Sequence, residues 1–262
     1  MKFLESILAR KKEEIKYLPH GFPVIKKQLI PFADLLRGTR TALIAEIKPA
    51  SPSCGKLIDR KAIPAMVDIF NRHAQAISVL CDAKDFGGGY DLLAEVRSLS
   101  TLPLLAKEFI LDERQIALAA NHGADAVLLI AAILSAEELG RLTLHALSLD
   151  LDILLEMHGG DEIEKIAGLL EKLSPVQKQH SIFGINNRDL RTGKVDLHTT
   201  ITLAPVLRER FGDSYPIITE SGIVVPADVH RLAPFVRGFL VGTSILQSKE
   251  PGAFISDLFH SR

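Results

Sequence analysis

Cysteine is scarce in this chain, net charge is almost absent, and there is no long hydrophobic run. Cys54 and Cys81 are the only cysteines among 262 residues, too few for a disulfide framework, which makes a reducing cytoplasm the expected location. The formal net charge of −1 argues against a basic surface for nucleic acid, and no polybasic run marks a membrane-binding patch. These absences favour a protein whose partner is a small molecule.

The hydrophobic runs are too short to cross a membrane. The longest extends from Ala126 to Leu134, far below the about 20 residues that a spanning helix needs. The first residues, Met1 to Leu8, include charged side chains and lack the uninterrupted apolar core of a signal peptide. The sequence therefore predicts a soluble protein that is not exported.

The composition, with 47% hydrophobic and 24% charged residues, is that of a globular protein with a sizeable core. This length could form two small domains, but it is also close to the ~250 residues of a single (β/α)8 barrel. Because no linker or low-complexity stretch divides the chain, we predict one domain over residues 1–262.

Residues 1–42 precede the first expected strand and are predicted to form an N-terminal helical extension. Within residues 1–18, apolar side chains from Leu4 to Leu18 recur near one helical face, and the charged run from Arg10 to Glu14 lies largely off it. A second short amphipathic segment follows at residues 32–37. We expect this extension to pack over one end of the barrel.

From Leu43 onward, short apolar runs alternate with segments of helical periodicity. The expected strands are 43–47, 76–81, 104–106, 126–130, 153–157, 182–185, 217–219 and 238–241. The expected helices are 63–73, 90–99, 112–122, 135–147, 161–173, 199–210 and 226–232, with a last one after Pro251. A doubly wound open sheet shows the same alternation, but no G-x-G-x-x-G follows the first strand, and polar residues recur at the strand ends. The pattern therefore favours a closed (β/α)8 barrel with parallel strands.

The first strand carries two charges on one face. Glu46 and Lys48 are two residues apart and must point the same way from a strand. An edge strand with a surface ion pair is one interpretation. The other is a strand that opens into an active site, since burying two charges for packing alone would cost several kcal/mol (roughly,). The following turn, Ser51 to Gly55, offers hydroxyl and backbone N–H groups that suit a phosphate oxygen.

Polar side chains also end several later strands. Because the carboxyl ends of barrel strands meet at one mouth, we expect these groups to converge. The set is Lys107, Glu108, Glu156, His158, Asn186, Asn187, Arg188, Glu220, Ser221 and Thr243. Lysines crowded among glutamates perturb one another's pKa values, as acid–base catalysis requires. Gly222 and Gly242 follow strands seven and eight, the usual phosphate site of these barrels. His158 is interpreted as a structural or rim residue rather than a catalyst, Cys54 as a free thiol, and Gly87 to Gly89 as a connector or a lid.

These residues, in this order, resemble the indole-3-glycerol phosphate synthase family of tryptophan biosynthesis. The resemblance extends from Glu46 to the end of the chain, and the N-terminal extension fits it. The motifs that carry it are Glu46-Ile-Lys48-Pro-Ala-Ser51-Pro-Ser53, Lys107-Glu-Phe109-Ile-Leu-Asp112, Leu155-Glu156-Met-His158, Gly184-Ile-Asn186-Asn187-Arg188-Asp189-Leu190 and Glu220-Ser221-Gly222-Ile223. Pro49, Cys81, Glu108 and Thr243 depart from the usual family residues, and none of these departures removes a proton-transfer group.

The resemblance implies a cofactor-free and metal-free reaction. It converts 1-(2-carboxyphenylamino)-1-deoxyribulose 5-phosphate into indole-3-glycerol phosphate, releasing carbon dioxide and water. It implies Lys107 as the general acid of ring closure, with Glu156, Glu46 and Lys48 for deprotonation and dehydration. Asn186 and Glu220 would orient the substrate. The implied binding residues, which contact the phosphate, the anthranilate ring or other parts of the substrate, are Ser51, Phe86, Phe109, Arg188, Leu190, Ser221, Gly222, Leu240, Gly242 and Thr243.

Two other functions fit parts of this pattern. A related barrel isomerase such as phosphoribosylanthranilate isomerase would use a Cys/Asp or Asp/Asp pair, whereas this chain offers Lys107 and Glu156. A non-catalytic sugar-phosphate sensor would keep the phosphate site and lose at least one catalytic position, and here all of them are present. The expected partner is the small-molecule substrate alone, without nucleic acid or membrane, and a monomer is compatible with the sequence.

Overall fold

The strands of the chain form a closed barrel in the computed structural model, which describes residues 2–19, 30–38 and 41–260. The eight barrel strands are β1 (Ala42–Ile47), β4 (Ala76–Leu80), β5 (Leu104–Lys107), β6 (Ala126–Ile130), β7 (Asp152–Met157), β8 (Ser181–Asn186), β9 (Ile217–Glu220) and β10 (Gly238–Val241). They close in the order β1-β10-β9-β8-β7-β6-β5-β4, and every neighbouring pair is parallel. The predicted barrel is confirmed, and the open doubly wound sheet is excluded.

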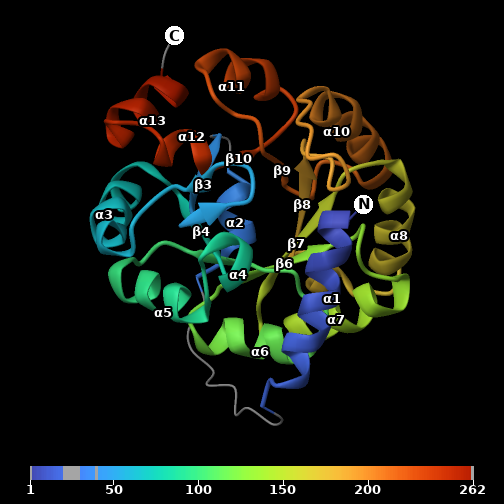
Figure 1. The fold of residues 1–262 in the computed structure, drawn as a ribbon. Coiled ribbons are helices and arrows are strands. Elements are labelled where there is room, and N and C mark those ends of the chain that lie inside the picture. Colours follow the sequence, from blue (N-terminus) through green and yellow to red (C-terminus); the bar gives the residue numbers. More distant parts are fainter. Residues whose placement is uncertain (1, 20–29, 39–40, 261–262) are drawn as a thin grey trace.

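A ring of helices surrounds these strands (Figure 1). The longer ones are α3 (Ile63–His73), α5 (Tyr90–Leu99), α6 (Glu113–Asn121), α7 (Ala136–Ser148), α8 (Gly160–Leu170), α10 (His198–Phe211), α11 (Pro226–Leu232) and α13 (Pro251–His260). Asp112 and Ser135 cap α6 and α7 through side-chain bonds to the first-turn N–H groups. The predicted extension of one helix to Leu173 is wrong, because α8 ends at Leu170 and Ser174 caps a separate helix, α9 (Pro175–Lys178).

Several short elements escaped the sequence prediction. They are the hairpin β2 (Ala50–Ser51) and β3 (Gly55–Lys56), the 3-10 turn η1 (Arg60–Ala62), and the helices α4 (Ala83–Phe86) and α12 (Thr243–Leu246). Each is only two to four residues long, too short to show a periodicity. Three of them, the hairpin, α4 and α12, follow β1, β4 and β10 and therefore shape the carboxyl mouth of the barrel.

Alternating strand residues divide the core into two layers. One set points into the barrel and packs as a single cluster that includes Ile44, Leu105, Leu128, Leu154 and Leu240. The other set faces the helices and belongs to the larger outer core. This period-two alternation fixes which side chains reach the mouth: Glu156 follows Leu154 on the inward face of β7.

The residues before β1 reach both ends of the barrel. Helix α2 (Phe32–Leu36) closes the amino end: Phe32, Ala33 and Leu36 are buried against the inner cluster. The N–H groups of Phe32 and Ala33 donate to Asp152 Oδ2 at 2.7 and 2.8 Å, while His180 Nδ1 lies 2.7 Å from Asp152 Oδ1. Helix α1 (Lys2–Lys16) instead contacts residues that follow β4 and β5, at the carboxyl mouth. The expectation that the extension covers one end is therefore wrong.

Two cations of the charged run on α1 are shielded from solvent, while Lys12, Glu13 and Glu14 are exposed. Lys11 is only 3% exposed, and Arg10 is partly buried, because carboxylates from the barrel mouth meet both side chains. Residues 20–29 and 39–40 of the expected extension lie outside the described residues.

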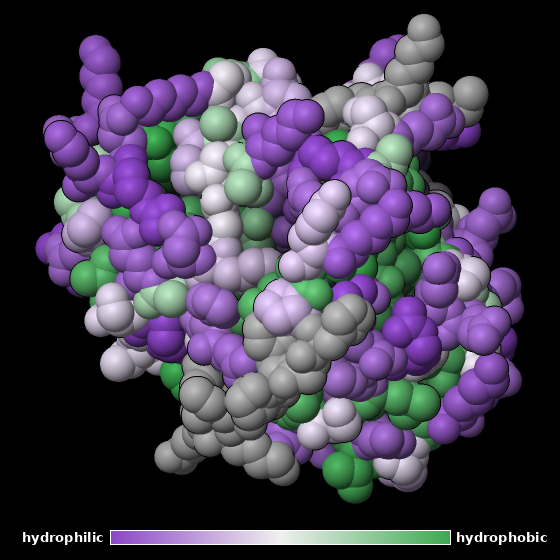
Figure 2. All heavy atoms as spheres, turned by 60° about the horizontal axis from the view of Figure 1, so that its bottom comes forward, coloured by the Kyte–Doolittle hydropathy of each residue, from purple (hydrophilic) through white to green (hydrophobic). Residues whose placement is uncertain are grey.

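The surface has an ordinary composition. On the face shown in Figure 2, hydrophilic side chains cover most of the area and hydrophobic ones are scattered between them. Among the described residues, we find no helix with the length and apolar character needed to span a bilayer.

Candidate active site

A cavity of about 700 Å³ occupies the carboxyl mouth of the barrel. It brings together nearly all residues that the sequence singled out. The lining includes Glu46, Lys48, Phe86, Lys107, Phe109, Glu156, Asn186, Arg188, Leu190, Glu220, Ser221, Gly222, Leu240, Gly242 and Thr243. Ser51 does not line it. The Ser51 hydroxyl accepts the Cys54 N–H at 3.1 Å and so stabilises the turn of the β2–β3 hairpin.

Lys107 is the centre of the charged part of the cavity. From the end of β5, its Nζ lies 3.2 Å from Glu156 Oε2 and 2.8 Å from Glu220 Oε2. Both carboxyl groups are 1% exposed, so each depends on this ammonium for compensation of its charge. Lys48, the other lysine of the mouth, pairs with Glu46 instead, Nζ to Oε1 at 2.7 Å.

The pKa values of Glu156 and Glu220 are shifted in opposite directions by the groups around them. Burial raises the pKa of Glu220 to about 8, and the nearby Glu156 charge adds to this, although Lys107 opposes it. For Glu156, burial also favours the neutral form, but the charges of Lys107 and His158 outweigh it and lower the pKa. The pKa of Lys107 is raised despite burial, because Glu156, Glu220 and Glu46 surround it. At neutral pH the site therefore holds an ammonium, an ionised Glu156 and a protonated Glu220.

Two glycines, one within β8 and one directly after β10, make space for these carboxylates. A Cβ on Gly184 of β8 would lie 2.5 Å from Glu220 Oε1, and a Cβ on Gly242 would lie 2.6 Å from Glu46 Oε1. Any larger residue at either position would displace a glutamate. Gly184 was not predicted to be functional; its signal in the sequence is a glycine inside a buried strand, which marks a close approach by another group.

His158 lies closer to the charged centre than expected. It follows Glu156 by two residues on the same inward face, and its Nε2 lies 3.4 Å from Glu156 Oε1. Neither ring nitrogen has a hydrogen-bond partner among the described residues. His158 therefore places an imidazole in contact with a buried carboxylate at the rim of the charged centre.

The opposite end of the cavity suits a phosphate. Ser221 and Gly222 follow β9 with φ angles of 67° and 89°, and Gly242 precedes α12, which Thr243 opens. The first N–H groups of a helix have no partner within it, and loops after strands seven and eight are where such barrels bind phosphate. The Ser244 hydroxyl ties the two loops together by donating to Ile223 O at 2.8 Å.

Apolar side chains line the remaining wall. The rings of Phe86 and Phe109 lie 6.3 Å apart, and Leu190 is on the same cavity. Leu80, Leu128 and Ile130 also line it and were not predicted, since nothing distinguishes an inward-facing leucine of the mouth from one of the core. Cys54 lines the cavity as well, where the sequence indicated only a free thiol.

No group of three or more histidine, cysteine, aspartate or glutamate side chains that could hold a metal ion occurs in the described part of the chain. The chemistry that these residues can supply is proton transfer by Lys107 and the glutamates, next to an anion site and an apolar wall.

Comparisons with known proteins agree on one family. The family model described as indole-3-glycerol phosphate synthase matches residues 4–258. An indole-3-glycerol phosphate synthase from Streptococcus pneumoniae is 38% identical over 259 residues, which cover 98% of this chain and 96% of that protein. The tryptophan biosynthesis protein TrpCF from Vibrio parahaemolyticus is 39% identical over 215 residues, 82% of this chain and 43% of that protein. For the TrpCF of Helicobacter pylori, the match covers 94% of this chain and 52% of that protein. The chain thus spans about half the length of these TrpCF relatives.

Replacing Glu220 by glutamine should remove a pH dependence of stability. The free side chain loses its proton near 4.5, whereas in the folded protein Glu220 keeps it up to about 8. Between these values the folded state binds more protons than the unfolded state, so this group costs the wild type stability as the pH rises. In thermal melts, the Tm of Glu220→Gln relative to wild type should therefore increase from about pH 5 to about pH 8 and then level off.

The exposed Glu250 provides the matched control, and Glu250→Gln is melted over the same pH range to give the effect of removing a surface carboxylate. A constant difference for Glu220→Gln would mean that Glu220 ionises in the folded protein as it does in water.

Proposed function

The chain belongs to the indole-3-glycerol phosphate synthase family, the carboxy-lyases of tryptophan biosynthesis, and we propose the reaction and the residues that carry it out. The substrate is 1-(2-carboxyphenylamino)-1-deoxyribulose 5-phosphate, and the products are indole-3-glycerol phosphate, carbon dioxide and water. The observation that supports this proposal best is the Lys107 ammonium, buried between Glu156 and Glu220 at 3.2 and 2.8 Å and open to a cavity with an apolar wall and an anion site.

Lys107 acts in ring closure. The ring carbon that bears the carboxylate attacks the ketone carbon, the ketone oxygen takes a proton from Lys107, and a hydroxyl results. The ring meanwhile becomes cationic. Phe86, Phe109 and Leu190 hold the anthranilate ring in a region of low dielectric, where a placed ammonium and carboxylate act more strongly than in water. Loss of carbon dioxide then leaves its bonding electrons with the ring and restores aromaticity.

The remaining glutamates and Lys48 act in dehydration. The new hydroxyl leaves as water with a proton, while a second proton leaves the adjacent CH2 carbon, which yields the indole double bond. Glu156, ionised and next to Lys107, is the base, and the Lys48–Glu46 pair supplies and accepts protons at the other side of the cavity. Asn186 and the protonated Glu220 orient the substrate through hydrogen bonds to its hydroxyl groups.

The other binding residues hold the phosphate end. Ser221, Gly222, Gly242 and Thr243 contribute backbone N–H and hydroxyl groups, Lys48 and Arg188 contribute positive charge, and Leu240 packs beneath the substrate. Ser51 belongs to this set only if the β2–β3 hairpin rearranges when the substrate binds.

The same proposal includes the organisation of the molecule. Residues 1–262 act as one catalytic domain, and residues 1–42 form its N-terminal helical extension. The enzyme works in the cytoplasm, as a monomer, with the small-molecule substrate as its partner.

Replacing Lys107 by methionine tests the proposal most simply. Removal of a general acid typically lowers turnover by ~10²–10⁴-fold. Lys107→Met should therefore nearly abolish the appearance of indole fluorescence after substrate addition, with the far-UV circular dichroism of the wild type retained. A variant within about threefold of wild type would remove Lys107 from this role.

The wild type in the same assay separates the alternatives. A sugar-phosphate sensor would bind the substrate and form no indole, and a phosphoribosylanthranilate isomerase would form none from this substrate either. Either result would overturn the proposed reaction.

Ser221 offers a test of the phosphate site. Its φ of 67° is one that asparagine and aspartate tolerate better than most residues. Ser221→Asp places a negative charge beside the phosphate and should raise KM by at least about tenfold, whereas Ser221→Asn, of the same shape and neutral, should stay within about threefold of wild type. Equal KM values for the two variants would place the phosphate elsewhere. Gly242 is unsuitable for this test, because any side chain there displaces Glu46.

A further inference from the structure

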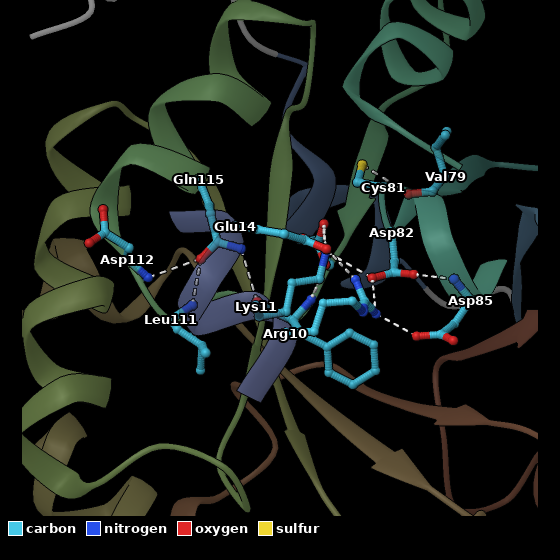
Figure 3. Close-up of polar contacts among 12 residues, drawn as sticks. Arg10, Lys11, Glu14, Val79, Cys81, Asp82, Asp85, Leu111, Asp112 and Gln115 are labelled. Atoms are coloured by element: carbon cyan, nitrogen blue, oxygen red, sulfur yellow. Dashed lines mark hydrogen bonds and ion pairs between the residues drawn. The ribbon is translucent and has the colours of Figure 1, made fainter. Parts of the chain in front are cut away.

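Lys11 is a buried cation that the proposed reaction does not use. It lies on α1, and its Nζ contacts Asp82 Oδ2 at 2.8 Å, Glu108 Oε2 at 2.9 Å and Glu14 Oε2 at 3.0 Å. Arg10, one residue before it, binds Asp82 at 2.9 Å and also pairs with Asp85. Figure 3 shows that Arg10 and Lys11 of α1 both point toward Asp82, and that Arg10 also contacts Asp85. Asp82 follows β4 and Glu108 follows β5, so one ammonium joins two neighbouring strand ends.

Each of these two carboxylates fixes the segment that carries one ring of the apolar wall. Asp82 Oδ1 accepts the Asp85 N–H at 2.8 Å and so caps α4, whose last residue is Phe86. Glu108 Oε1 accepts the N–H of Phe109 at 2.7 Å. The second oxygen of each carboxylate is the one that binds Lys11. Lys11 is therefore bonded to both supports of the Phe86–Phe109 pair.

The ion cluster around Lys11 fixes the positions of Asp82 and Glu108 more than it stabilises the fold. A buried ion cluster replaces favourable hydration with pairing, and apolar side chains of similar volume often stabilise a protein as well or better. Burial alone would lower the pKa of Lys11, but Glu108 and Asp82 raise it, so the side chain stays charged. A charged side chain differs from an apolar one because its hydrogen bonds are directional. The Lys11 ammonium therefore fixes both carboxylates at hydrogen-bond distance.

We propose that Lys11 is a positioning residue for the aromatic end of the substrate. From outside the cavity, Lys11 sets the separation of Phe86 and Phe109. This inference rests on the proposed function, because it takes the anthranilate ring as the group that binds between the wall and Lys107. Lys11 touches neither the substrate nor the proton-transfer groups. Its loss should weaken binding of the aryl group and leave the phosphate site, on the opposite side of the mouth, unchanged.

The test compares Lys11→Met with Lys12→Met, since Lys12 is the exposed neighbour on the same helix. Two ligands report on the two ends of the cavity. The substrate analogue with its ketone reduced to a hydroxyl carries the aryl group, and inorganic phosphate alone occupies only the phosphate site. For Lys11→Met we expect a Kd for the reduced analogue raised at least about tenfold, a Kd for phosphate within about twofold, and a KM increase that exceeds any fall in kcat. Lys12→Met should match the wild type in all three.

Glu108→Gln is the second variant, in case Lys11→Met does not fold. Glutamine keeps an oxygen for the Phe109 N–H but loses the ion pair with Lys11. The variant should therefore show the same rise in the Kd for the reduced analogue, with the Kd for phosphate unchanged. An equal loss of affinity for both ligands in these variants, or no loss of affinity for either, would overturn the positioning role. A lowered Tm with unchanged affinity for the reduced analogue would overturn it as well.

Failure of the proposed function is visible separately in the wild type. If the wild type forms no indole, the reaction is wrong, while the ratio of the two Kd values still decides whether Lys11 positions the wall.

Discussion

The ion pairing of the partly buried Lys107 ammonium with two glutamates is the interaction on which the active-site mouth depends. The ammonium lies within 3.2 Å of Glu156 and 2.8 Å of Glu220, two carboxyl groups that would each cost several kcal/mol to bury alone (roughly,). The barrel makes this arrangement possible because the carboxyl ends of its strands meet at one mouth, and because Gly184 and Gly242 leave space for Glu220 and Glu46. Burial and the charge of Glu156 raise the pKa of Glu220 against the opposing effect of Lys107, whereas for Glu156 the charges of Lys107 and His158 outweigh burial and lower the pKa. The site thus contains a proton donor and a proton acceptor at neutral pH.

The residues before β1 contribute to both ends of the barrel by different means. At the amino end, α2 supplies apolar side chains and two backbone N–H groups to Asp152. At the carboxyl end, α1 supplies charge, through Lys11 and Arg10, to the supports of the apolar wall. The first contact closes the core, and the second reaches the residues that support the apolar wall of the cavity. The two helices of this segment therefore pack against the barrel in different ways, α2 through apolar side chains and α1 through charge.

Much of the fold was readable from the sequence, for identifiable physical reasons. Buried parallel strands are apolar along their length, and all eight expected strands occur within one residue of their predicted bounds at each end. Caps such as Asp112 and Ser135 act locally, so their effect is visible in the sequence. The residues that converge at the mouth were predictable because strand ends meet there, and the resemblance to a family named most of them.

The misses have two physical causes, a contact distant in sequence for Lys11 and a local hydrogen bond for Ser51. Lys11 belongs to a charged run that would be exposed on an isolated helix, and it is buried only because Asp82 and Glu108 approach from far along the chain. Ser51 uses its hydroxyl within its own turn, which a motif does not reveal.

The most direct test of the central claim is Glu156→Gln, which keeps the shape of the side chain and removes its ability to take a proton. If Glu156 transfers a proton beside Lys107, kcat for indole formation should fall by about 100-fold or more, while the Kd for the reduced substrate analogue stays within about threefold of wild type. Turnover that survives, with folding or binding weakened instead, would show that Glu156 only balances the charge of Lys107 and would contradict the account.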